Sequence, residues 1–68
     1  MEKVKIIGCQ HADGNYACGR VEESINDFLT KELPKVSGKL IDIKLSITAE
    51  NHMFLVTAMI IYKIEDTT

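Results

Sequence analysis

The hydrophobic positions divide the first half of the chain into one strand-like and one helical segment. Lys3 to Cys9 alternates charged and aliphatic residues, which is the period of a strand with one wet face, and Gly8 lies at its end. From Val21 to Leu33 the apolar residues recur at helical spacing, and Pro34 is expected to stop the helix. These apolar positions are Val21, Ile25, Phe28, Leu29 and Leu33. The pattern predicts a strand followed by an amphipathic helix.

The second half predicts two long strands between Lys39 and Ile64, after a turn at Ser37-Gly38. Lys39 to Glu50 alternates aliphatic and polar residues, and Glu50-Asn51-His52 predicts a hairpin turn. The last strand is apolar on both faces, whereas residues 65–68 are expected to form a frayed polar tail. One face of this strand carries Phe54, Val56, Ala58, Ile60, Tyr62 and Ile64, and the other carries Met53, Leu55, Met59 and Ile61.

The order strand, helix, strand, strand predicts a single α+β domain over residues 1–68, with βαββ topology. We expect a three-stranded, mainly antiparallel sheet with the last strand in the middle and the helix on one face. The face with Met53, Leu55, Met59 and Ile61 is then uncovered, so we expect these residues to form an interface. A core in a 68-residue chain contributes only about 3–5 kcal/mol, which favours a homo-oligomer.

Charge and composition exclude several classes of partner. The net charge of −2 offers no general attraction for nucleic acid, whose binding depends on Lys and Arg. No stretch approaches the roughly 20 apolar residues that span a bilayer, and the N-terminus does not resemble a secretory signal. We therefore expect a soluble, cytoplasmic protein with no nucleic-acid or membrane partner. In that compartment the two cysteines would be reduced thiols.

The segment from Gln10 to Gly19 lacks periodicity and is predicted to be a long loop, with a tight turn at Asp13-Gly14-Asn15. Backbone N–H groups at the following helix start, adjacent glycines and an arginine are typical of an anion site, and Tyr16 can stack on a ring. The candidate ligand-binding residues are His11, Asn15, Tyr16, Gly19 and Arg20, and the expected ligand is a small anion or nucleotide. The alternative is an exposed loop with a solvated Arg20, since no known phosphate-binding fingerprint is present.

Zinc-competent side chains occur at Cys9, His11, Asp13, Cys18 and His52. The predicted topology places the long loop and the hairpin at the same end of the sheet. Their spacing, however, matches none of the usual paired ligand spacings, so we assign no metal site and no cofactor. A cysteine nucleophile would also need an orienting group, an oxyanion donor and a cleft. We therefore expect a protein that is not an enzyme.

Four segments of the chain resemble a family of very small proteins first named for sporulation in Gram-positive spore formers, with relatives carried by their phages. The segments are residues 3–6 (KVKI), 21–29 (VEESINDFL), 40–45 (LIDIKL) and 57–62 (TAMIIY). The resemblance implies no catalytic residues, because the family has no established mechanism. It implies a role such as a phage-type antagonist of host defence that sequesters a nucleotide-like signal between subunits. Residues 10–19 depart from the family pattern, which has a short acidic linker there.

Two functions remain open at this point. The first is a non-catalytic, homo-oligomeric protein that binds a nucleotide-like anion at residues 10–20. The second is a structural or regulatory module without a small ligand, which docks on another protein by its sheet edge or by the face carrying Met53 and Met59.

Overall fold

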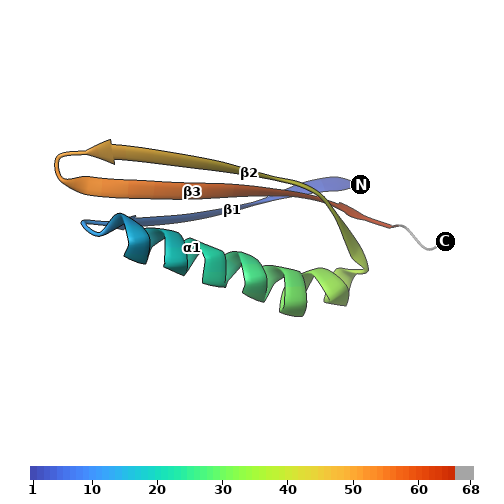
Figure 1. Cartoon of the computed structure of the whole chain (residues 1–68). Coiled ribbons are helices and arrows are strands. Elements are labelled where there is room, and N and C mark those ends of the chain that lie inside the picture. The colour runs from blue at the N-terminus through green and yellow to red at the C-terminus, as the bar shows by residue number, and fades with distance from the viewer. Residues whose placement is uncertain (66–68) are drawn as a thin grey trace.

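The protein forms one three-stranded sheet with a helix on one side, in a computed structural model that describes residues 1–65 (Figure 1). Along the chain these are β1 (Glu2–His11), α1 (Gly14–Asp27), β2 (Gly38–Glu50) and β3 (Met53–Ile64). Strand β3 lies between β1 and β2 and is antiparallel to both. The predicted α+β fold and strand order are therefore confirmed. Residues 66–68 of the predicted tail lie outside the described residues.

The core forms where α1 packs on β3. Alternate β3 residues point toward the helix, and three of them, Val56, Ala58 and Ile60, are almost fully buried. Ala17 and Val21 of α1 pack with Val56 and Ala58. A second cluster contains Ile60 and, from the chain beyond α1, Phe28 and Leu33. The helical part of the chain from Ala17 to Leu33 and one face of the central strand thus account for all the buried side chains among the described residues.

The predicted loop from Gln10 to Gly19 is wrong, because only two residues connect β1 to α1. Strand β1 continues to His11, and α1 begins at Gly14, seven residues before the predicted start at Val21. The carboxylate of Asp13 caps the helix by accepting hydrogen bonds from the backbone N–H groups of Asn15 (2.9 Å) and Tyr16 (3.4 Å). Such a cap stabilises a helix by about 1 kcal/mol, which offsets the low helix propensity of a glycine in the first turns.

The predicted end of the helix at Leu33 also needs correction. After α1 ends at Asp27, the chain continues through a π-helical turn (Phe28–Glu32) and a 3-10 turn (Leu33–Val36). Pro34 lies in the first turn of this 3-10 segment, where its missing N–H is not needed, so it does not stop the helical path. The path ends at Ser37, whose φ of 52° is left-handed.

The hairpin turn predicted at Glu50-Asn51-His52 is confirmed. Glu50 pairs with Met53 across the turn, and the two residues between them both have positive φ, 52° for Asn51 and 63° for His52. Two successive left-handed residues define a type I′ turn, whose twist matches that of the strands it joins. This turn fixes the register of β2 against β3, and therefore the face on which each β2 side chain lies.

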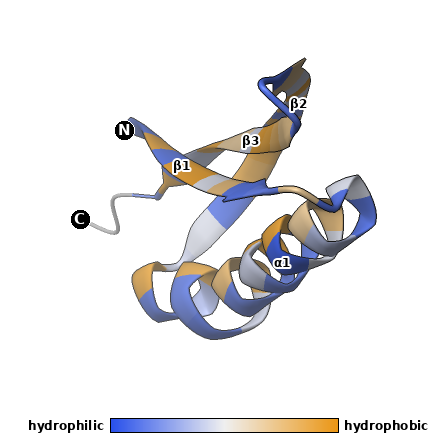
Figure 2. Ribbon diagram, turned by 90° about the vertical axis from the view of Figure 1, so that its left-hand side faces the viewer, coloured by the Kyte–Doolittle hydropathy of each residue, from blue (hydrophilic) through white to orange (hydrophobic). Residues whose placement is uncertain are grey.

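The helix covers only two of the three strands. It packs against β1 and β3, and β2 lies beside it without comparable contact (Figure 2). The consequence is visible in β2 residues that face the helix side of the sheet: Leu45 is 58% exposed and Ile47 is 54% exposed. Both faces of the sheet therefore carry uncovered apolar side chains.

Candidate functional site

The five predicted ligand residues do not share a loop. His11 is the last residue of β1, whereas Asn15, Tyr16, Gly19 and Arg20 all belong to α1. His11 and Tyr16 are brought together: their ring centroids lie 4.3 Å apart with the planes inclined by 36°. The ring of Tyr16, which we expected to stack on a ligand, therefore already contacts the ring of His11.

The helix start is occupied by the protein itself. The expected anion donors were the N–H groups of a helix start at Val21, but Val21 lies inside α1. At the observed start, the N–H groups of Asn15 and Tyr16 donate to the Asp13 carboxylate, and the N–H of Asp13 donates to His11 Nδ1 at 3.0 Å. The carboxylate also places a negative charge where an anionic ligand was expected. Of the features that suggested an anion site, Arg20 is exposed, and Tyr16 is 51% exposed although its ring contacts that of His11.

Tyr16 and Arg20 line one flank of the helix. With Ser24 they are spaced by four residues, so all three lie on the same side of α1. Gly19 and Asn15 each precede one of them by one residue and are therefore turned about 100° around the helix axis. The flank brings Tyr16 and Arg20 together but separates them from the other two α1 candidates.

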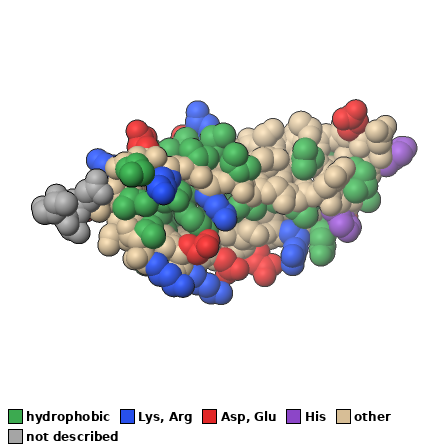
Figure 3. All heavy atoms as spheres, turned by 180° about the vertical axis from the view of Figure 1, so that it is seen from behind, with side chains coloured by type: hydrophobic (Ala, Val, Ile, Leu, Met, Phe, Trp, Pro, Cys, Tyr) green, Lys and Arg blue, Asp and Glu red, His purple; other side chains and the backbone are tan. Residues whose placement is uncertain are grey.

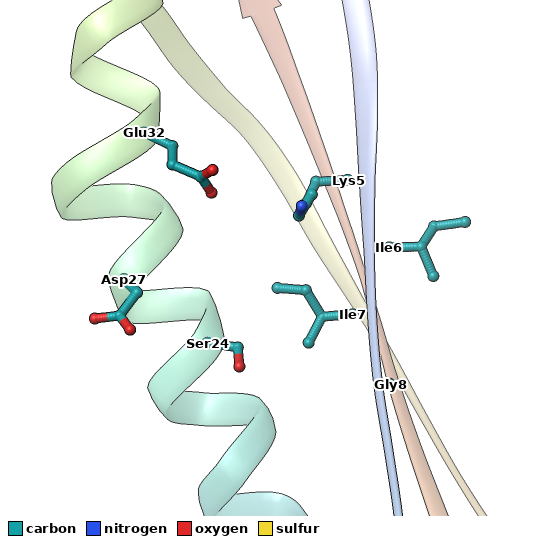
Figure 4. Close-up of a pocket in the computed structure, with 7 residues that line it drawn as sticks. All are labelled: Lys5, Ile6, Ile7, Gly8, Ser24, Asp27 and Glu32. Carbon is teal, nitrogen blue, oxygen red and sulfur yellow. The ribbon is translucent and has the colours of Figure 1, made fainter.

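Further along this flank, an open depression of about 420 Å³ lies between α1 and β1 (Figure 4). Figure 4 shows Lys5 and Ile7 directed toward the helix and Ile6 directed away from it. The lining residues are Lys5, Ile6, Ile7, Gly8, Ser24, Asp27 and Glu32. Because two carboxylates and one ammonium line it, the depression has no surplus of positive charge for an anion. The sequence does not predict this depression, because its lining residues come from segments without a recognisable motif.

The zinc-competent residues do not form a metal site. Within residues 1–65, no three His, Cys, Asp or Glu side chains lie close enough together to hold an ion. Cys9 and Cys18 are free, partly buried thiols that pack against the core. The two histidines do lie at the same end of the molecule, as the topology predicted (Figure 3).

The predicted interface residues belong to a larger apolar surface on the face of the sheet opposite α1. Leu55 is 44% and Met59 is 37% exposed, whereas Met53 and Ile61 are partly buried. The register adds two β1 residues, since Val4 pairs with Ile61 and Ile6 pairs with Met59. We call this surface the outer stripe; it consists of Val4, Ile6, Met53, Leu55, Met59 and Ile61.

The sequence did not predict that β1 contributes to the outer stripe. Its charged residues were expected on the face exposed to water and its aliphatic residues on the face toward the helix. Lys3 and Lys5 pair with Tyr62 and Ile60, so the two lysines lie on the helix side. They are at the edge of the sheet, where long side chains can keep their ammonium groups in water. The aliphatic partners Val4 and Ile6 consequently face outward and are 53% and 64% exposed.

A second uncovered surface lies on the helix side of β2, where the helix does not reach. It consists of Leu45, Ile47 and Ala49, which we call the β2 shelf. Phe54 of β3 pairs with Ala49 at its end and is 36% exposed. Together with the outer stripe, the shelf leaves apolar side chains in contact with water on both faces of the sheet.

Comparison with known proteins adds no further assignment. No protein family model, no curated protein and no solved structure matches the chain. The resemblance to the sporulation-named family therefore stays a prediction. Among residues 1–65 there is also no helix long and apolar enough to cross a membrane.

Proposed function

We propose that the protein is a non-catalytic homo-oligomer that binds a small ligand. The observation that carries this proposal is the pair of uncovered apolar surfaces, one on each face of a single sheet. A second copy covers such surfaces without any additional component, and its burial adds to the small core of a 68-residue chain.

The ligand part of the proposal is supported by the flank that carries Tyr16 and Arg20. An exposed aromatic ring next to a guanidinium suits a ligand that is both planar and anionic, such as a nucleotide. The resemblance to small phage-borne proteins supports the same class of ligand, and with it a role in which a nucleotide-like signal is sequestered.

Two measurements test these parts separately. Sedimentation velocity over a range of protein concentrations tests the oligomer, and a sedimentation coefficient of a single chain at every concentration would contradict it. Isothermal titration against a panel of cyclic and linear nucleotides tests the ligand. Heat that is lost in Arg20→Gln and kept in Lys35→Gln supports nucleotide binding, because Lys35 lies in the 3-10 segment, away from this flank.

The second candidate is a module that docks on another protein through the outer stripe. The observation that favours it is Met59, a flexible side chain at the centre of an exposed apolar surface, since methionine adapts to irregular partners. Three results together would favour this candidate over the first. The chain captures one other protein in stoichiometric amount, Leu55→Glu abolishes this capture, and the chain by itself remains monomeric.

A further inference from the structure

The two edges of the sheet differ in how well they are protected against pairing with another strand. Charged side chains that point toward the core side of an edge strand hinder such pairing, and β1 carries Lys3 and Lys5 in this orientation. Strand β2 has neither a proline nor a charged residue on its helix side between Ile43 and Glu50. Its pairing with β3 is regular from Asp42 to Glu50, since the one irregularity lies between Leu40 and Asp42. The β2 edge is therefore long, regular and open.

We propose that two copies of the chain pair through their β2 edges, antiparallel, with Ile47 opposite Ile47 of the second copy. The inference deepens the proposed function and rests on its claim of a homo-oligomer. The product is a continuous six-stranded sheet in which residues 44–50 of each chain supply the new backbone hydrogen bonds. Strand addition of this kind gives affinity through the backbone and specificity through the facing side chains.

The charges on the outer face of β2 select this register. With Ile47 at the two-fold axis, Lys44 of each chain faces Glu50 of the other, so two opposite-charge pairs form. A register centred on Ser46 would instead bring Asp42 and Glu50 together twice, and like charges in facing positions are destabilising. A register centred on Ile43 pairs Asp42 with Lys44 but requires the irregular segment at Leu40 to take part.

The same register places polar side chains opposite polar ones and apolar side chains opposite apolar ones. On the outer face Ser46 lies opposite Thr48 of the second copy. On the helix side Leu45 lies opposite Ala49, so the two β2 shelves join edge to edge. If one β2 strand slid along the other by a single residue, Leu45 would lie opposite a polar residue, because side chains alternate between the two faces.

The pairing also positions the two helices. Facing residues of an antiparallel pair lie on the same side of the sheet, so both copies of α1 lie on one face. Each α1 lies over β1 and β3, which places the two helix axes about four strand spacings apart, or ~19 Å. Subtracting a helix diameter of about 10 Å leaves a groove ~9 Å wide, with the joined β2 shelves as its floor.

Charge reversal at β2 tests the pairing. Lys44→Glu or Glu50→Lys converts both attractive contacts into repulsive ones, so the dimer dissociation constant measured by sedimentation should rise about tenfold. The double variant with both changes should restore dimerisation, and Glu23→Lys on the exposed side of α1 is the matched control. Circular dichroism confirms folding of each variant, which is expected because both β2 side chains are exposed.

The possible outcomes separate this inference from the proposed function. A dimer that is weakened by both single changes and restored by the double change supports β2 pairing. A dimer that is insensitive to all three variants but lost in Met59→Glu overturns β2 pairing and leaves the homo-oligomer intact. A single chain at every concentration overturns both. In a mixture of isotope-labelled and unlabelled protein, nuclear Overhauser contacts between Ser46 and Thr48 of different chains would establish the register, and contacts between other β2 positions would contradict it.

Discussion

Truncation of one isoleucine in the core and one on the β2 shelf should have very different effects on the stability of the single chain. Ile60 and Ile47 lie on the same side of the sheet, in neighbouring strands. Ile60 has no exposed surface, so Ile60→Ala should lower the free energy of unfolding by about 2–5 kcal/mol. Ile47 is 54% exposed, and complete burial of such a side chain is worth about 1.5–3 kcal/mol, so Ile47→Ala should cost only about 1 kcal/mol.

Urea unfolding followed by circular dichroism at the lowest practical protein concentration measures both effects without a contribution from assembly. The cost of Ile47→Ala should then grow as the protein concentration is raised, because a residue at a subunit contact stabilises the folded state by mass action. Equal costs for the two variants at low concentration would refute the claim that α1 leaves β2 uncovered. A cost for Ile47→Ala that is the same at all concentrations would place this residue outside the subunit contact.

Further predictions concern four single substitutions. Gly38→Ala should destabilise the fold by about 1–3 kcal/mol in thermal unfolding, because the new Cβ would overlap the side chain of buried Leu33. Gly19→Ala, whose new Cβ would have nothing within 4 Å, should stabilise α1 by up to about 1 kcal/mol in the same assay. His52→Gly should raise stability by about 0.5–1 kcal/mol in the same assay, since glycine accepts the φ of 63° without strain. The ammonium of Lys39 lies 2.6 Å from the carboxylate of Glu65 and lowers the pKa of Glu65. This pair therefore stabilises the fold at neutral pH, and its effect is lost as the pH falls through that pKa. Lys39→Met should raise the pKa of Glu65 in an NMR titration.

Much of the fold follows from periodicity in the sequence. The helical stripe from Val21 to Phe28 and the alternation in β2 each indicate one element, and the doubly apolar β3 indicates the central strand. The hairpin turn could be placed because the residues between two long strands were few and polar. These features depend on neighbours along the chain, which is the information that a single sequence contains most directly.

The errors arose where contacts between elements decide the structure. Two glycines made residues 10–19 look like a loop, but the Asp13 cap and the burial of Ala17 against β3 hold the first turns of α1 in place. Because those turns are helical, the predicted ligand residues are distributed around α1. The sequence also could not predict which faces of β1 and β2 are exposed. That depends on where α1 packs across the sheet, and the periodicity of each segment contains no information about this position.

The central claim is that the chain associates with a second copy of itself through surface that α1 leaves open. Sedimentation equilibrium from nanomolar to high micromolar protein measures this directly. A mass that rises from one chain to a dimer or a larger closed assembly, with thermal stability rising alongside it, is the predicted result. A mass of 7.6 kDa over the whole range, with a sharp and concentration-independent melting transition, would contradict the claim.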